Sequence, residues 1–515
     1  MNCFPYLQTG FLVGFLALST SAATLYVDVN GTNPISPYAD WSTASTNIQD
    51  AVNAATNGDI VQVTNGVYSP ISVGIPLTIN SINGTNWTSI DGGGTKQCAH
   101  LADGCKLIGF TLTNGNSLYS YGGGVGCLSS HAYIYDCLII SNASAYGGGG
   151  AFNGTLIACT LFGNYAVLGG GGAYSSVLSN CVLNCNMVVR PGSGGGGAAD
   201  SSLYGCLVIS NLGYQFGGGA IYSKLSGCVV VSNSTVTNYD TGLGRGGGIY
   251  GSTAENCLVA GNFASESGGG AYVGYLRNCT VVDNVSGLLG GGLQSSIASN
   301  SIIYYNVGQS GLPSNFGSPG SCRNCCVTPM QLGSANITNE PLFVNHGGGD
   351  YHLQSNSPCV NSGNNAYVTF ATDLDGNPRI SGDTVDIGAY EFQNPASVIS
   401  YAWLQQNGLP TDGSADFFDT DGDGMSNYAE WRAGTSPLDP SSLLRILSVS
   451  NTVSGATVTW QSVPGTSYCV QQTTNPDAQS FSSIASNLVG QTGVASFTDA
   501  GATNVGSVFY RVGVQ

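Results

Sequence analysis

Four acidic side chains fall within residues 419–430, which read Asp-Thr-Asp-Gly-Asp-Gly-Met-Ser-Asn-Tyr-Ala-Glu. Carboxylates occupy positions 1, 3, 5 and 12 of this segment, with glycine at position 6 and asparagine at position 9. Hard oxygen ligands in this spacing suit Ca²⁺, to which position 7 contributes a backbone carbonyl. An unliganded acidic turn is the alternative. The predicted ligands are Asp419, Asp421, Asp423, Met425, Asn427 and Glu430.

The surroundings of this loop favour a structural role for the ion. Position 8 holds Ser426, where an apolar residue is usual, and no second loop of this kind follows in the sequence. The spacing matches an EF-hand loop, and the segment also resembles the thrombospondin type 3 and dockerin-like calcium repeats of secreted proteins. We expect Ca²⁺ to rigidify the link between two domains rather than to take part in catalysis.

A repeat of about 22 residues precedes the loop. Successive cysteines lie 22, 22, 25, 22, 29 and 22 residues apart, each is followed five residues later by asparagine, and glycine runs recur at a fixed distance before them. The short β-branched and aliphatic stretches after the cysteines favour strands over helices. We therefore predict an all-β fold, a right-handed parallel β-helix whose coils stack roughly 4.8 Å apart. The repeating cysteines are Cys137, Cys159, Cys181, Cys206, Cys228, Cys257 and Cys279.

Stacking gives the repeated residues a structural interpretation. Equivalent Cβ atoms of neighbouring coils lie roughly 5 Å apart, which is longer than the roughly 3.8 Å of a relaxed disulfide. We expect a stack of buried thiols, with bridges within the ladder or a metal site as alternatives. The asparagines should form an inward ladder whose amides bond to one another and to turn backbone. Cysteines outside the ladder are candidates for bridges that cap the solenoid ends: Cys98, Cys105, Cys322, Cys325, Cys326 and Cys359.

Two insertions interrupt the repeat on the same edge. One repeat gains seven residues and another, two coils earlier, gains three, and both gains lie between the asparagine and the next glycine run. At the coil spacing the insertions are roughly 10 Å apart. Insertions on one edge of a solenoid commonly form its binding face, although a tolerated surface loop is the alternative. The candidate ligand-binding residues are Tyr239, Asp240, Arg245 and Arg190.

No catalytic residue is assigned. A glycoside hydrolase needs paired carboxylates, and a lyase needs a base together with Ca²⁺ or arginine to neutralise a uronate. The acids of residues 120–310 fall at different phases of the repeat, so they do not build one cluster. The Asn-Thr-Asp and Arg-Ile-Lys motifs of polygalacturonases and the arginine motif of pectate lyases are absent from the sequence.

Composition and the N-terminal segment indicate export. Lys and Arg total 11 against 28 Asp and Glu, a net charge of −17, which argues against a nucleic-acid partner and against anionic membrane surfaces. Residues 11–18 form a short apolar core followed by small residues, which predicts a signal peptide cleaved near Ala23. No other segment is long enough to cross a bilayer.

The segments that flank the repeat resemble those of known exported proteins. Residues 45–64 predict a short helix and a strand, and such a helix would cover the open end of the solenoid. Residues 373–379 with 386–391 resemble the closing segment of bacterial choice-of-anchor Q domains. The glycine and cysteine-asparagine repeat is similar to polymorphic outer-membrane protein repeats, and the whole of residues 25–393 to the pectin-lyase-like fold. The resemblance implies a fold and a secreted, cell-surface or outer-membrane fate in a bacterium, but no reaction.

The C-terminal residues predict a separate module. Residues 444–515 alternate apolar and polar side chains between turns, which favours a small β-sandwich, and Trp460, Tyr468 and Phe509-Tyr510-Arg511 resemble fibronectin type III-like modules. The predicted boundaries are 1–23 for the signal peptide, 24–100 for the N-terminal cap and first coils, 101–393 for the β-helix with its closing segment, 394–440 for the calcium-binding linker and 441–515 for the sandwich.

Together these patterns predict an exported surface or extracellular protein. We expect it to be non-catalytic, to contact polysaccharide or a cell-surface glycan as an adhesin or scaffold, and to bind Ca²⁺ as its cofactor. The alternative is a polysaccharide lyase or glycoside hydrolase on the same fold. The sequence does not indicate the oligomeric state.

Overall fold

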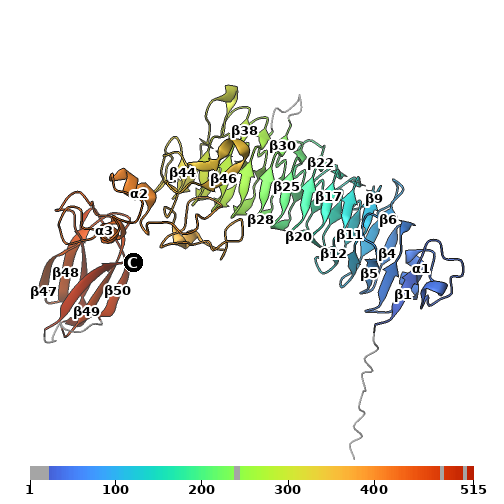
Figure 1. Cartoon of the computed structure of the whole chain (residues 1–515), viewed down its shortest axis with the longest axis horizontal. Coiled ribbons are helices and arrows are strands. Elements are labelled where there is room, and N and C mark those ends of the chain that lie inside the picture. The colour runs from blue at the N-terminus through green and yellow to red at the C-terminus, as the bar shows by residue number, and fades with distance from the viewer. Residues whose placement is uncertain (1–21, 237–243, 476–480, 503–506) are drawn as a thin grey trace, which may run out of the picture.

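The computed structural model describes residues 22–236, 244–475, 481–502 and 507–515. It confirms the predicted right-handed parallel β-helix, followed by short helices and a pair of small antiparallel sheets. Figure 1 shows an elongated molecule in which the coils stack from the blue N-terminal region to the yellow coils, with the red C-terminal module beyond them. Within the described ranges, no helix has the length and apolar character needed to cross a membrane.

Each coil passes through three long parallel sheets, and the middle coils add a short strand to a fourth. Sheet A contains β1 (Thr24–Val27), β2 (Ile60–Val63), β5 (Thr78–Ser81), β8 (Lys106–Ile108), β12 (Tyr133–Tyr135), β16 (Thr155–Ile157), β20 (Val177–Ser179), β24 (Ser202–Tyr204), β28 (Lys224–Ser226), β32 (Thr253–Glu255), β36 (Tyr275–Arg277), β40 (Ile297–Ser299) and β43 (Ser321–Arg323). Sheet B contains β3 (Gly66–Tyr68), β6 (Thr88–Asp91), β9 (Thr111–Thr113), β13 (Leu138–Ile140), β17 (Thr160–Phe162), β21 (Val182–Asn184), β25 (Leu207–Ile209), β29 (Val229–Val231), β33 (Leu258–Ala260), β37 (Thr280–Val282), β41 (Ile302–Tyr304) and β44 (Cys326–Val327).

The remaining two sheets lie on the edge that carries the glycine runs. Sheet C contains β4 (Ile71–Val73), β7 (Ala99–Leu101), β11 (Val125–Cys127), β15 (Ala151–Phe152), β19 (Ala173–Tyr174), β23 (Ala198–Ala199), β27 (Ala220–Ile221), β31 (Ile249–Tyr250), β35 (Ala271–Tyr272), β39 (Leu293–Gln294) and β42 (Phe316–Gly317). Sheet D contains β10 (Asn116–Ser117), β14 (Ala143–Ser144), β18 (Tyr165–Ala166), β22 (Met187–Val188), β26 (Leu212–Gly213), β30 (Ser234–Thr235), β34 (Phe263–Ala264) and β38 (Val285–Ser286).

The core is a set of columns of apolar side chains. A typical three-residue strand points its central residue inward, so that Ile134, Leu156 and Leu178 stack in register and are fully buried. Since each column continues from coil to coil, burial of apolar surface stabilises every coil against its neighbours.

The asparagine ladder forms as predicted. The Oδ1 atom of Asn164 accepts hydrogen bonds from both the backbone N–H and the side-chain amide of Asn142, each at 3.0 Å. The Asn164 side-chain amide donates in turn to the Ile139 carbonyl at 2.8 Å and to Asn186 at 3.0 Å. The same pattern continues coil by coil to Asn306. These amides are buried, and their mutual bonding makes them structural.

The cysteine ladder is a stack of buried free thiols, which confirms the preferred interpretation. The Sγ atom of Cys181 accepts a hydrogen bond from the backbone N–H of Cys159 at 3.4 Å, and burial raises the pKa of the Cys257 thiol. The cysteines for which end-capping bridges were predicted are also buried free thiols in the structure.

The glycine runs occupy backbone that has no room for side chains. A Cβ atom on Gly149 would lie 2.2 Å from the Tyr165 carbonyl oxygen. Gly148 has φ of +65°, in the left-handed region that glycine adopts most readily. Both the lack of space for a Cβ atom and the positive φ therefore favour glycine in these runs.

A short helix covers the N-terminal end of the solenoid, as predicted. Helix α1 (Ile48–Ala54) begins after Asn47, whose side chain accepts a hydrogen bond from the Asp50 N–H. Its buried face consists of Ile48, Ala51 and Val52, and Ala55 caps its C-terminal end. The apolar face thereby shields the edge of the first coil from solvent.

The segment after the last coil folds back over the outer face of sheet B. It contains the antiparallel hairpin of β45 (Phe343–Asn345) and β46 (Asp350–Leu353). Apolar side chains such as Phe343 and Ile387 pack against Ile302 in one buried cluster. Asn300, which has φ of +47° at a coil corner, exchanges hydrogen bonds with the backbone of Asn364 at 2.9 Å in both directions. We call residues 340–393 the closing segment.

The C-terminal region contains a short helical link and, beyond it, the predicted small β-sandwich. Helices α2 (Tyr401–Gln406) and α3 (Asn427–Ala433) flank the acidic loop. One sheet of the sandwich contains β47 (Ile446–Thr452), β48 (Gly455–Ser462) and β51 (Gly493–Asp499), and the other β50 (Ser482–Val489), β49 (Ser467–Thr473) and β52 (Phe509–Val514). The buried rings of Trp460 and Tyr468 meet between them at 5.8 Å. Short 3₁₀ turns are η1 (Trp41–Thr43), η2 (Gln309–Gly311), η3 (His346–Gly348), η4 (Asn365–Tyr367) and η5 (Ala500–Ala502).

Candidate functional site

The acidic loop brings its three aspartates together ahead of α3. Single oxygen atoms from Asp419, Asp421 and Asp423 lie within 4.8 Å of one another. Backbone N–H groups of the loop orient these side chains: Gly424 donates to Asp419 at 2.9 Å, and Met425 donates to Asp423 at 2.7 Å. The spacing of the sequence therefore creates a concave set of carboxylates within one turn of chain.

Several oxygens of this cluster have no hydrogen-bond partner among the described residues. Asp421 and Asp423 each have one such buried oxygen, and both carboxylate oxygens of Glu430, a fully buried side chain in the first turn of α3, are without a donor. Burial, followed by repulsion from the nearby aspartates, raises the pKa of Glu430 to about 7. Buried carboxylates without donors are costly unless a cation compensates them. The chemistry of this donor set fits Ca²⁺.

The two other predicted ligands have additional contacts within the protein. The Asn427 amide oxygen accepts a hydrogen bond from the Thr420 hydroxyl at 2.9 Å, and its amide nitrogen donates to the Ala415 carbonyl at 2.7 Å. The Met425 sulfur accepts from the Leu444 N–H at 3.4 Å, next to the sandwich. These side chains connect the loop to the chain before and after it.

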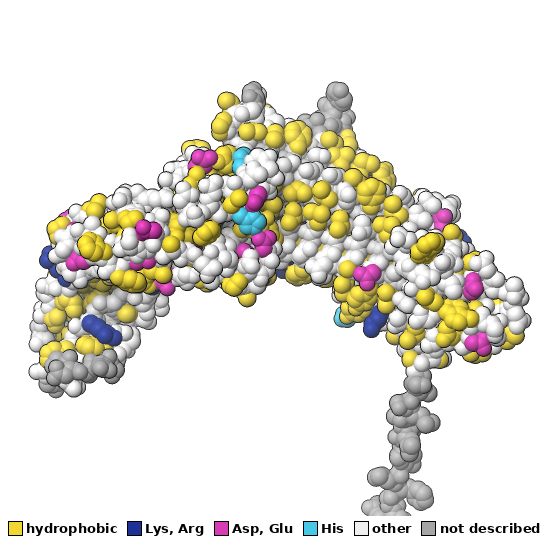
Figure 2. Space-filling model, in the orientation of Figure 1, with side chains coloured by type: hydrophobic (Ala, Val, Ile, Leu, Met, Phe, Trp, Pro, Cys, Tyr) yellow, Lys and Arg dark blue, Asp and Glu magenta, His cyan; other side chains and the backbone are white. Residues whose placement is uncertain are grey.

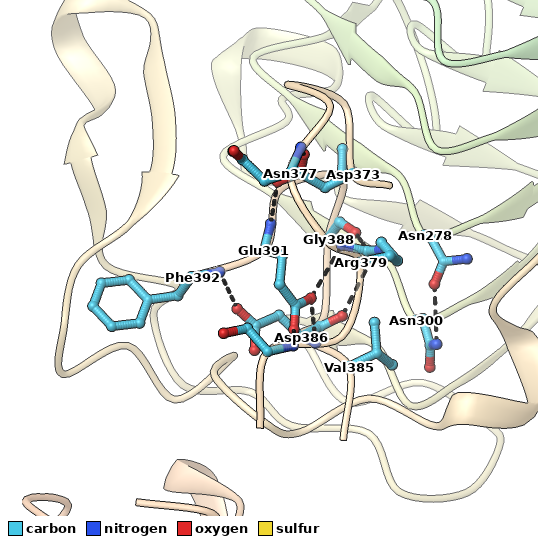
Figure 3. A network of polar contacts seen from close by, with 12 residues as sticks. Asn278, Asn300, Asp373, Asn377, Arg379, Val385, Asp386, Gly388, Glu391 and Phe392 are labelled. Carbon is cyan, nitrogen blue, oxygen red and sulfur yellow. Dashed lines mark hydrogen bonds and ion pairs between the residues drawn. The ribbon is translucent and has the colours of Figure 1, made fainter. Parts of the chain in front are cut away.

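A second cluster of carboxylates lies in the closing segment around one buried arginine (Figure 3). Asp373, Asp386 and Glu391 each accept at least two hydrogen bonds from backbone N–H groups, so that every one of their oxygens has a donor. The Arg379 guanidinium lies 3.4 Å from Glu391. Burial raises the pKa of Asp386 and of Glu391 and lowers the pKa of Arg379. With its donors supplied internally, this cluster is structural.

The structure describes only part of the solenoid edge that the sequence predicts to bind a ligand. Tyr239 and Asp240 lie outside the described residues. Arg245 donates to both carboxylate oxygens of Glu266, at 2.9 and 3.0 Å, and its guanidinium lies 5.1 Å from the centre of the Tyr272 ring. This arginine is therefore held against the edge of the next coil by a bidentate ion pair.

The shorter insertion lies two coils away on the same edge. Arg190 is exposed, and the chain after it returns to the solenoid at Gly194. Gly194 forms a parallel β-bridge with Phe216 on the next coil, and Phe216 forms one with Arg245 on the coil after that. The structure thus brings Gly194 and Arg245, which follow the two insertions in the sequence, to one edge, while most of the longer insertion lies outside the described residues.

On the same edge, the outward-facing side chains of sheet C form a row of aromatic rings that two smaller residues, Ala199 and Ile221, interrupt. Stacked rings lie on both sides of the gap: the ring centres of Phe152 and Tyr174 are 6.0 Å apart, and those of Tyr250 and Tyr272 are 5.4 Å apart with an interplanar angle of 2°. The outward row, in order of coils, is Phe152, Tyr174, Ala199, Ile221, Tyr250, Tyr272 and Gln294.

The gap becomes a pocket because the neighbouring row carries glycine on the coils of Tyr174 and Ala199. Gly169 and Gly194 precede Phe216 in that row, and the resulting hollow has a volume of about 220 Å³. Tyr174 forms one wall, stacked on Tyr121 at 5.5 Å, and Tyr222, which is 59% exposed, lies on the other side.

Polar groups reach the same pocket. Ser193, from the shorter insertion, and the exposed Asp200 line it. Burial and then the Asp200 carboxylate raise the pKa of Tyr174, which indicates that the carboxylate lies close to this phenol. Aromatic walls with a few polar groups are typical of small-ligand sites.

Sequence reasoning missed Tyr174, Asp200 and Tyr222 because it considered only the inserted residues. A signal was available: the position two residues after each glycine run holds a ring in several coils and Ala199 in one. The sequence does not indicate that Tyr121 and Tyr222 also line the pocket, because neither residue occupies the repeat position of the aromatic row.

Known proteins resemble this chain mainly in architecture. Similar solved structures include pectate lyase Pel9A (15% identity, covering 72% of this chain and 97% of that chain, TM-score 0.42) and a rhamnogalacturonan lyase (13%, 63% and 91%, 0.31). A complex of XylC with xylose has 8% identity, coverage of 72% and 99%, and a TM-score of 0.39. At these values the similarity carries no argument about activity. No curated protein matches the chain. Residues 419–440, which contain the acidic loop, match the model of the bacterial TSP3 repeat, a calcium-binding type of repeat.

Proposed function

We propose that this chain is an exported, non-catalytic protein of the cell surface or extracellular space that binds glycans in the pocket between Tyr174 and Tyr222. The observation that carries the proposal is the gap in the aromatic row, where Ala199 and Ile221 stand in place of rings and Gly194 leaves the neighbouring row without a side chain on the coil of Ala199. The resemblance of the closing segment to choice-of-anchor Q proteins supports the exported role.

The chemistry of the pocket suits a sugar. The C–H faces of a sugar ring pack on the electron-rich faces of tyrosine rings, while its hydroxyls hydrogen-bond to groups at the rim. Asp200 can accept from such hydroxyls, and Ser193 can donate or accept. Among the described residues that line the pocket, Asp200 is the sole carboxylate, whereas a glycoside hydrolase uses two.

We further propose that one Ca²⁺ bound by Asp419, Asp421, Asp423 and Glu430 stiffens the link between the solenoid and the sandwich. The bare buried oxygens support this proposal, because a cation would supply the charge compensation that the protein itself does not. Thermal stabilisation by Ca²⁺ that is lost in Asp419→Ala would support the site. The absence of any calcium effect in the parent protein would reject it.

Calorimetric titration of the purified chain against neutral and acidic oligosaccharides tests the glycan proposal. Ala199→Tyr restores the ring that the row lacks and should fill the pocket, and Tyr174→Ala removes one wall. We expect each change to weaken binding by about 10-fold or more, because an aromatic contact contributes about 0.5–1.5 kcal/mol beyond area burial. Tyr135→Ala, which removes a ring from the outer face of sheet A, is the matched control.

Two outcomes would contradict the proposal. Equal affinity in the parent and in Ala199→Tyr would exclude the pocket as the binding site. New reducing ends, or absorbance from an unsaturated uronate, would instead support the alternative of a glycoside hydrolase or polysaccharide lyase.

A further inference from the structure

A second and larger hollow lies on sheet A, away from the aromatic pocket. It has a volume of about 480 Å³ and runs across the outer faces of β32, β36, β40 and β43. Tyr367 of the closing segment lines it as well, so the groove lies between the solenoid and the segment that folds back over it. We call it the arginine groove.

One row of outward side chains gives the arginine groove its charge. Arg277 pairs in register with Ser299, and Ser299 pairs with Arg323 on the next coil. The two arginines are thus two coils apart, on the order of 10 Å along the solenoid axis. Glu255 precedes them in the same row, one coil before Arg277.

Cations are scarce elsewhere on this molecule. The chain has 11 Lys and Arg in 515 residues and a net charge of −17, yet the groove carries two arginines and a single acid. On the face drawn in Figure 2, hydrophobic and uncharged side chains cover most of the central coils and Lys and Arg are few. A local positive excess on an acidic protein indicates an anionic ligand.

Both arginines are available to a ligand. Arg277 lies 3.5 Å from Glu255, with its side chain 50% exposed, and such an exposed pair holds its partners weakly. Among the described residues, no carboxylate lies within ion-pair distance of Arg323. Because the guanidinium fork matches a carboxylate in two hydrogen bonds, each arginine can hold one carboxylate of a ligand.

The walls of the groove suit sugar rings. Tyr275 is 57% exposed on the row beside the arginines, and Tyr367 faces the groove from the closing segment. Contacts within the protein fix this wall: Asn278 donates to the Tyr367 carbonyl at 2.9 Å, and the Thr369 hydroxyl donates to Glu255 at 3.3 Å. Ser299 and Ser321 add hydroxyls on the floor.

We propose that the arginine groove binds an oligosaccharide that carries carboxylate groups, aligned with the solenoid axis so that Arg277 and Arg323 each pair with one carboxylate. The groove is separate from the pocket at Ala199 and is carried by different residues, so this inference stands even if no glycan enters that pocket. The ligand is a polymer of uronic-acid type, since two charges on the order of 10 Å apart must be satisfied together.

Calorimetric titration of the full chain with a hexamer of uronic acid tests the proposal. Arg277→Gln and Arg323→Gln should each raise the dissociation constant about 10-fold, because each removes one charge-assisted pair. Binding by the parent should weaken as NaCl is raised. The matched control is Lys106→Gln, which removes a cation from the same face of sheet A several coils away and should leave affinity unchanged. Melting temperatures of all variants establish that they fold.

Comparison ligands decide the chemical class. A carboxyl-reduced hexamer of the same length should bind at least about 10-fold more weakly than the acid. Equal affinity for the reduced hexamer, or for a sulfated hexamer or a polyglutamate peptide, would overturn the assignment. If Ala199→Tyr abolishes binding of the acid while Arg323→Gln does not, the acid binds in the aromatic pocket and the proposal is wrong.

Discussion

Two clusters of acidic side chains differ in how their charge is compensated: one is buried in the closing segment, and the other, in the acidic loop, joins three partly buried aspartates to the buried Glu430. In the closing segment, Arg379 and backbone N–H groups supply a donor to every oxygen of Asp386 and Glu391. In the loop, both oxygens of Glu430 are buried, and none of the residues that the structure describes donates to them.

The difference shows how a structural cluster can be told from a ligand site. A carboxylate that accepts several N–H bonds is already compensated, and a cation would have to displace those donors. A carboxylate whose buried oxygens face other carboxylates is compensated only when a cation arrives. The predictions below test whether the two clusters really differ in this respect.

The largest expected effect comes from removing the internal cation. Arg379→Met leaves the buried carboxylates of the closing segment without their counter-charge, so the free energy of unfolding should fall by about 3–5 kcal/mol. Urea denaturation monitored by circular dichroism measures this change. Arg445→Met, at an exposed position before β47, is the control and should cost less than about 1 kcal/mol. A similar loss in both variants would remove the distinction.

Calcium should stabilise the loop and leave the closing segment unaffected. At a concentration of 100 times its dissociation constant, an ion that binds only the folded state adds about 2.7 kcal/mol. Glu430→Gln should remove most of this gain, whereas Asp412→Asn, at an exposed acid before the loop, should retain it. Calorimetry in Ca²⁺ and in chelator measures the gain. A full calcium response in Glu430→Gln would show that this residue is not a ligand.

The closing segment should respond to pH in a defined direction. The raised pKa values of Asp386 and Glu391 mean that the folded state binds more protons than the unfolded state above about pH 4. The free energy of unfolding should therefore fall as pH rises from 5 to 8, by on the order of 1 kcal/mol per unit, and Asp386→Asn should flatten this slope. Urea denaturation across this pH range in saturating Ca²⁺ checks it; an unchanged slope would contradict the assignment.

The smallest effect on stability is expected at the contact between the closing segment and helix α3. Arg432 of α3 lies 3.5 Å from Asp383 of the closing segment, and the side chains are 42% and 37% exposed. An exposed pair contributes about 0–1 kcal/mol, so Arg432→Ala should shift the melting temperature only slightly. A shift as large as that of Arg379→Met would mean that this contact, rather than the buried cluster, holds the closing segment.

Much of the fold followed from local spacing. The cysteine and asparagine intervals predicted the coil, and Ile48, Ala51 and Val52 predicted the covering helix. These predictions succeeded because coil length and helical periodicity depend on residues close in sequence. The two hollows did not follow, because Ala199, Tyr222 and Tyr367 meet the other lining residues only after the coils have stacked and the closing segment has folded back over them.

The sequence by itself therefore determined the solenoid, its inner ladders and the ligand spacing of the acidic loop, where the interacting groups are separated by a fixed number of residues. The tertiary structure decided which acids are compensated: Arg379 reaches Glu391 from another turn of the closing segment, while Glu430 packs where no donor reaches it. It also decided that Arg277 and Arg323 share one groove with Tyr367. Burial and charge pairing depend on what the rest of the chain places beside a residue, and that is fixed only when the coils have stacked and the closing segment has folded over them.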